Sequence, residues 1–111
     1  MNKIFILSKD ENVHIIDPII FKYSKYLQSL YQMNSKIGSF KYPIFLQKIN
    51  SFFINYIVEY ILYLESNNNN DKEKILLQLL KMDKTKLKTF MEVLDLLKIK
   101  KDIFICSQIN E

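Results

Sequence analysis

The residue types that carry most enzyme chemistry are sparse in this chain of 111 residues. His14 is the only histidine and Cys106 the only cysteine, whereas a metal site or a nucleophile–histidine pair would need further partners. Gly38 is the only glycine, which excludes the glycine-rich phosphate loops of nucleotide-binding proteins. We therefore expect no enzyme activity, no metal and no other cofactor.

A leucine on the polar side of a helical pattern is the best candidate for a binding residue. Apolar residues recur at helical spacing near the C-terminus and predict one buried stripe, formed by Leu87, Phe90, Met91, Leu94 and Leu97. At about 100° per residue, Leu96 lies nearly opposite the centre of that stripe, beside the carboxylates of Glu92 and Asp95. Leu96 is either an ordinary exposed leucine or an apolar anchor for a partner protein, and spacing leaves both open.

The first half of the chain predicts a small sheet and two helices. Short apolar runs at 4–7 and 13–16, with polar residues between them, predict a β-hairpin. Asp17 and Pro18 predict the start of a helix that runs to about Tyr23, and Ser24 can cap a second helix over KYLQSLY. A polar loop is expected at 32–39 and a short strand at 42–46, where Pro43 favours a strand start or an edge.

The second half predicts helices. Asn50 and Ser51 can cap a helix over 52–64, which is apolar nearly all round and must be covered on most sides. The run ESNNNND at 65–71 predicts a mobile polar linker inside the domain. Beyond it, KILLQLLKM fits a helix or an irregular apolar segment, the helix of Leu96 follows, and a short helix is expected within 100–109. Residues 1–111 thus predict one α+β domain, a small mixed three-stranded sheet covered by about five or six helices.

The amino-acid composition limits the kinds of partner that we expect. The chain contains 16 lysines and no arginine, and its net charge is +4. Arginine is the side chain best suited to phosphates and base edges, so nucleic acid is not expected as a partner. The alternative, a basic nucleic-acid-binding module, would use the lysines of the C-terminal half: Lys84, Lys86, Lys88, Lys98, Lys100 and Lys101.

The sequence also indicates the cellular compartment that we expect. A single cysteine allows no internal disulfide, which favours a reducing compartment. The longest apolar run, at 52–64, is shorter than the ~20 residues that a membrane span needs. We expect a protein of the cytoplasm or nucleus with no signal peptide and no membrane partner.

Four strings, in this order, resemble the family of elongin C and the Skp-type BTB/POZ subunits of cullin ubiquitin ligases. IFILSKDENVHIIDPII resembles the opening hairpin of that family, and YSKYLQSLY resembles its second helix. YPIFLQKINSFFINYIVEYILYLE is similar to its third strand and long helix, and LLKMDKTKLKTFMEVLDLLKIKKDI is similar to a later helical segment. The resemblance extends from about Lys3 to Cys106 and implies a BTB/POZ fold.

The resemblance also implies a function and two sites. It implies a non-catalytic adaptor that bridges a cullin scaffold and a substrate receptor in a cullin–RING ubiquitin ligase. The exposed residue pair that the family uses on cullin corresponds to Asp95 and Leu96, with Glu92 bordering the same surface. An apolar groove for a receptor helix is implied at Tyr60, Phe90, Met91, Ile99 and Ile103; plain core packing is the alternative for the first four.

The sequence departs from the family pattern at the implied cullin site. Leu96 stands where the family has an aromatic residue, and Lys98 stands where it has an aspartate. The chain ends near the point where Skp-type adaptors continue into the helices that hold an F-box, so an elongin C-type receptor helix is the expected partner. A structural POZ-fold subunit of a kinetochore or transcription-elongation assembly is the main alternative. Self-association is left open.

Overall fold

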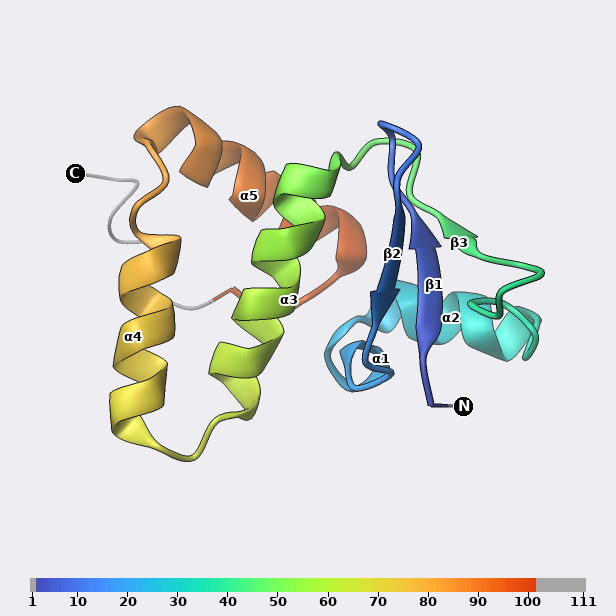
Figure 1. Cartoon of the computed structure of the whole chain (residues 1–111), viewed down its shortest axis with the longest axis horizontal. Coiled ribbons are helices and arrows are strands. Elements are labelled where there is room, and N and C mark those ends of the chain that lie inside the picture. The colour runs from blue at the N-terminus through green and yellow to red at the C-terminus, as the bar shows by residue number, and fades with distance from the viewer. Residues whose placement is uncertain (1, 102–111) are drawn as a thin grey trace.

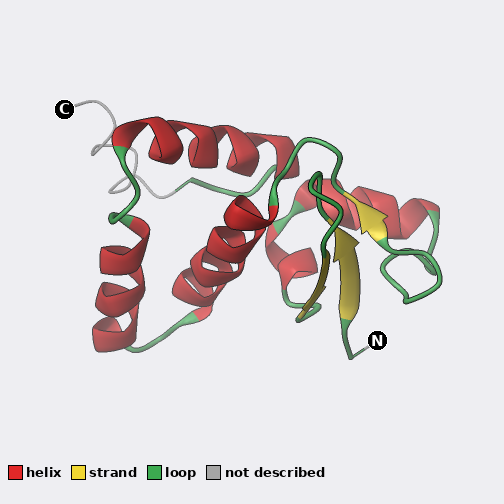
Figure 2. Cartoon of the chain, turned by 45° about the horizontal axis from the view of Figure 1, so that its top comes forward, coloured by secondary structure: helices red, strands yellow, loops and turns green. Residues whose placement is uncertain are grey.

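The computed structural model describes residues 2–101, and it confirms the predicted α+β class. Its elements follow in the order β1 (Ile4–Leu7), β2 (Val13–Ile16), α1 (Ile20–Tyr23), α2 (Lys25–Met33), β3 (Ile44–Phe45), α3 (Ser51–Glu65), α4 (Asn69–Leu79) and α5 (Lys84–Leu97). The three strands and α2 lie at one end of the molecule and α4 lies at the other (Figure 1, Figure 2). The short helix predicted within 100–109 and the predicted groove residue Ile103 lie outside the described residues, apart from residues 100 and 101.

The sheet is mixed, with β1 in the centre. β2 pairs with β1 in antiparallel register and β3 pairs with it in parallel register. Because side chains alternate across a strand, one face of the sheet sends its side chains into the core. The buried side chains on this face are Ile4, Ile6, Ile16 and Ile44. The opposite face is also apolar but partly open to solvent, and it carries Phe5, Leu7, Val13, Ile15 and Phe45.

The third strand is shorter than the strand predicted at 42–46. Tyr42 belongs to the preceding turn, where its carbonyl accepts a hydrogen bond from the Gly38 N–H at 2.7 Å and its N–H donates to the Ser39 carbonyl at 3.1 Å. Pro43 has no N–H to donate to a strand ladder. Pairing with β1 therefore begins only at Ile44.

The polar linker is also shorter than predicted. Only residues 66–68 lie between α3 and α4, because the asparagine-rich run starts the next helix. The Asn68 side chain accepts hydrogen bonds from the N–H groups of Asn70 and Asp71, at 2.9 and 3.3 Å, and so caps α4. The segment that follows, left open between helix and irregular structure, is helical through Leu79.

The core joins the long helix α3 to the predicted stripe of α5. The inward residues of α3 are Ile54, Ile57, Tyr60 and Ile61. The α5 stripe is buried as predicted, with Leu87, Phe90, Met91, Leu94 and Leu97 all in the core. α5 also contacts α2 and buries Val93 beside the stripe, while its side with Glu92, Asp95 and Leu96 is exposed to solvent.

Ser24 connects the start of α2 to the end of α5. Its hydroxyl accepts a hydrogen bond from the Leu27 N–H at 3.1 Å, so it caps α2 as predicted. The same hydroxyl donates to the carbonyl of Leu97 at 2.6 Å, and the residue is fully buried. One hydroxyl thereby fixes the position of α5 relative to α2.

We expect Ser24→Ala to lower the free energy of unfolding by about 1–3 kcal/mol, because it removes a helix cap and leaves a buried carbonyl without its donor. Urea unfolding measures this loss. Ser29→Ala is the matched control, since the Ser29 hydroxyl is exposed and bonds only within its own helix, to the carbonyl of Lys25. Equal stability of the two variants would contradict the role of Ser24.

Candidate docking site around Leu96

Leu96 points into solvent, as its spacing predicts. Its side chain is 45% exposed, whereas its neighbour Leu97 is buried. Glu92 and Asp95 are exposed on the same helix, and the Asp95 carboxylate pairs with the ammonium of Lys101 at 2.8 Å. The predicted cullin-binding residues thus form one solvent-facing group with an apolar side chain at its edge.

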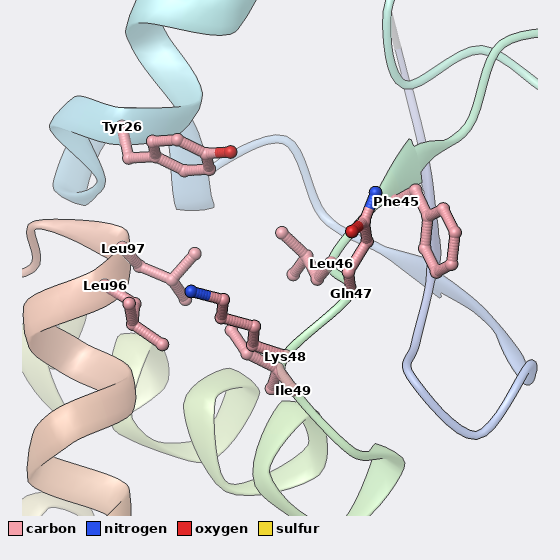
Figure 3. A pocket seen from close by; sticks show the side chains of 8 residues that line it. All are labelled: Tyr26, Phe45, Leu46, Gln47, Lys48, Ile49, Leu96 and Leu97. Atoms are coloured by element: carbon pink, nitrogen blue, oxygen red, sulfur yellow. The ribbon is translucent and has the colours of Figure 1, made fainter.

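Leu96 borders a hollow in the protein surface of about 360 Å³ (Figure 3). Its lining residues come from three segments far apart in sequence: the start of α2, the end of β3 with the connection to α3, and the end of α5. The floor is made of buried aliphatic side chains, Leu46, Ile49 and Leu97. The rim is made of exposed side chains, Tyr26, Phe45, Gln47, Lys48 and Leu96.

Backbone hydrogen bonds fix the segment that forms one wall of this hollow. The Leu46 N–H donates to the Leu7 carbonyl at 2.9 Å, and the Lys9 N–H donates to the Ile49 carbonyl at 2.8 Å. These two bonds hold the β3–α3 connection against the end of β1 and against the turn that follows it. The opposite wall is fixed by the Ser24–Leu97 bond, so both walls are in place before any partner binds.

The hollow combines apolar surface with one cation. In Figure 3, the Lys48 side chain extends from the β3–α3 connection toward the end of α5, where Leu96 and Leu97 lie. An apolar side chain of a partner would fill the hollow, and an adjacent carboxylate would meet Lys48. The hollow can therefore bind a partner protein by burying apolar surface and forming one ion pair.

The groove predicted for a receptor helix is not a groove among the described residues. Tyr60 and Phe90 are fully buried, and Met91 and Ile99 are at most 6% exposed. The Tyr60 hydroxyl donates to the carbonyl of Lys100 at 2.6 Å, and its ring meets the Phe90 ring edge-on at 5.8 Å. In the folded chain all four residues therefore pack in the core, at the place where the family resemblance implies a groove.

A polar cluster at the start of α3 contains the serine, histidine and aspartate of a hydrolase triad in a different arrangement. The Ser51 hydroxyl lies 2.9 Å from His14 Nε2 and 3.0 Å from Asp10 Oδ1. In a triad the carboxylate orients the histidine, but here Asp10 accepts directly from Ser51, from its hydroxyl and from its N–H at 2.9 Å. Asp10 thus caps α3 from the hairpin turn, a role that the sequence assigned to the side chains of Asn50 or Ser51.

This cap makes stability depend on acid pH. Hydrogen bonds from the Ser8 hydroxyl and from the N–H and hydroxyl of Ser51 hold the pKa of Asp10 well below its ordinary value of 3.8. A carboxylate with a lowered folded-state pKa stabilises the fold above its unfolded pKa, and that stabilisation is lost as pH falls toward the folded pKa. We expect the free energy of unfolding to decrease from about pH 5 to pH 2, and Asp10→Asn to flatten this part of the profile.

Urea unfolding at a series of pH values measures the slope. Glu11→Gln removes the neighbouring exposed carboxylate of the same turn and is the control that should retain it. A profile of Asp10→Asn parallel to that of the parent chain would contradict the role of Asp10.

Of the residues that line the hollow, only Leu96 was predicted as a site residue; Tyr26, Phe45 and Lys48 show why the others were missed. Phe45 follows the inward Ile44, so strand alternation could have predicted its outward position. Tyr26 precedes the buried Leu27 and lies off the apolar side of α2, the same signal that identified Leu96. Lys48 gave no signal, because only the folded chain brings it beside α5.

A comparison of the chain with protein-family models and with curated proteins found no match.

Proposed function

We propose that this protein is a non-catalytic adaptor that binds a cullin-type scaffold at the hollow around Leu96 and brings a substrate receptor to it. The observation that carries the proposal is the exposed Leu96 on the rim of a concave, partly apolar hollow, beside Asp95 and Glu92. The family resemblance puts the cullin contact at the same positions.

The order of elements supports the same proposal. The resemblance implies a hairpin, two helices, a third strand, a long helix and further helices, and β1 to α5 follow that order. The string YPIFLQKIN supplies both β3 and the wall of the hollow that contains Lys48. One stretch of sequence that resembles the family therefore contributes directly to the proposed site.

The mechanism is bridging. An adaptor that holds a scaffold and a receptor at once turns their encounter into an intramolecular event and raises the effective concentration of substrate at the ligase. The receptor, of the type that elongin C binds, would use a surface other than the core side chains of Tyr60, Phe90, Met91 and Ile99.

A native pull-down with mass spectrometry tests this function. Tagged chain expressed in its own cells should recover a cullin and a RING subunit in amounts comparable to the tagged protein. Recovery of chromatin or transcription-elongation proteins without a cullin would replace the proposal with that of a structural POZ-fold subunit.

Charge distribution argues against the nucleic-acid alternative. The lysines on which it depends lie in residues 59–111, where nine lysines are balanced by nine aspartates and glutamates. Lys101, one of the six, is paired with Asp95. Nucleic-acid binding would be revealed by an affinity that falls steeply with salt.

A further inference from the structure

The two most exposed large apolar side chains of the described residues lie in one segment, residues 33–42, which begins at the last residue of α2 and continues into the turn before β3. Met33 is 84% exposed and Phe40 is 82% exposed, and Tyr42 is also exposed. Lys36 and Lys41, in the same segment of the chain, are also exposed. This segment lies at one end of the molecule's longest axis (Figure 1). We refer to these five residues as the basic aromatic tip.

Hydrogen bonds hold the tip against the sheet. The Phe5 N–H donates to the Gly38 carbonyl at 2.7 Å, and the Gly38 N–H donates to the Tyr42 carbonyl at 2.7 Å. Gly38 has a φ of +89° and packs against Ile4, a conformation that favours glycine. The Phe40 ring meets the Phe5 ring edge-on at 5.6 Å. Phe40 is thus presented to solvent by an anchored turn, and Met33 by the end of α2.

The tip lies within a stretch that carries charge of one sign only. Residues 18–58 contain five lysines and no aspartate or glutamate. The ammonium of Lys41 lies 5.5 Å from the centre of the Tyr42 ring. A partner of the tip must therefore be apolar and negatively charged, which disfavours a second copy of the tip because the two would repel each other.

An apolar, negatively charged partner could be a protein or a lipid surface, and the lysines of the tip favour the lipid surface. Protein interfaces are depleted in lysine, whereas lysines beside exposed aromatic and apolar side chains are typical of proteins that bind anionic lipid surfaces. The tip also differs from the hollow at Leu96, because its side chains project outward from the surface. We infer that the tip binds the surface of an anionic lipid bilayer, with Met33 and Phe40 in the headgroup region and Lys36 and Lys41 on the acidic lipids.

This contact is peripheral. Within residues 2–101, no helix has the length and apolar character needed to cross a membrane. The expectation of no membrane partner came from hydropathy along the chain, which detects spans. It does not detect a surface that folding assembles at a turn.

The chain contains no tryptophan, so Phe40→Trp creates a specific fluorescent probe. Vesicles of phosphatidylcholine with about one-quarter phosphatidylserine should shift its emission to the blue, as the indole leaves water. Vesicles of phosphatidylcholine alone should produce little shift. Leu77→Trp, at an exposed position of α4, is the control and should not respond. No shift for Phe40→Trp, or an equal shift for both variants, would overturn the inference.

A charge variant tests the lysines separately. Each lysine near an anionic surface contributes about fivefold to binding, so K36Q/K41Q should weaken partition into these vesicles about 25-fold. Its unfolding midpoint should not change, since both lysines are exposed. Unchanged partition would overturn the inference. So would a variant that keeps its vesicle binding but loses a protein recovered by the parent chain, because the tip would then bind protein.

Discussion

Leu96→Arg is expected to weaken binding to purified cullin by at least a factor of about one hundred without lowering the melting temperature. Truncating an apolar anchor at the centre of an interface costs about 2–4 kcal/mol, and a hundredfold loss corresponds to about 2.7 kcal/mol. Arginine would also bring a cation close to Lys48 at the rim of the hollow. Because Leu96 is 45% exposed, the folded chain accommodates the larger side chain in solvent.

Isothermal titration calorimetry measures the affinity, and thermal unfolding measures the stability of the same samples. Leu77→Arg is the matched control, because Leu77 is a leucine of α4 that is 58% exposed and does not line the hollow. It introduces the same charge and should bind cullin like the parent chain. Full affinity of Leu96→Arg would remove this hollow as the cullin site, and equal losses in both variants would indicate a general effect of charge.

Phe90→Ala is expected to have the largest effect on stability, a loss of about 3–5 kcal/mol in the free energy of unfolding. The Phe90 ring is fully buried and meets the rings of Tyr60 and Tyr56 edge-on, at 5.8 and 6.4 Å. Its removal leaves a cavity where α5 packs on α3. For a single domain of this size, such a loss can exceed half of the total stability.

Urea unfolding of Phe90→Ala also tests the assignment of Phe90 to the core. Leu77→Ala, at an exposed position, should lie within about 0.5 kcal/mol of the parent chain. If Phe90 received a receptor side chain instead, its truncation would weaken receptor binding and change stability by less than about 1 kcal/mol.

The elements that the sequence predicts well are those set by local chemistry. The hairpin strands at 4–7 and 13–16 are confirmed, because short β-branched runs around a polar turn have few other stable arrangements. The Ser24 cap is confirmed, since it needs only a hydroxyl at the right distance from the helix start. The exposed side of Leu96 follows from helical period alone.

The elements that the sequence predicts less well depend on distant residues. Asn50 was a good candidate cap by type, but the hairpin turn delivers Asp10 to the start of α3 instead. Asparagines at 65–71 suggested a linker, yet a single cap by Asn68 is enough to begin α4 among them. A helix side that packs on another helix of the same domain has the same apolar pattern as a side that binds a partner. The sequence alone therefore could not assign Phe90 and Met91 to the core or to a binding site.

The hydrogen bond between Ser24 and Leu97 spans 73 positions of the chain. A ribosome must therefore synthesise the chain through α5 before α2 acquires its final partner. Until then, the isoleucines of the nascent hairpin and Leu27 of α2 lack part of their cover and form a substrate for chaperones. The N-terminal sheet and α2 are consequently expected to reach their final packing only after α5 has left the ribosome.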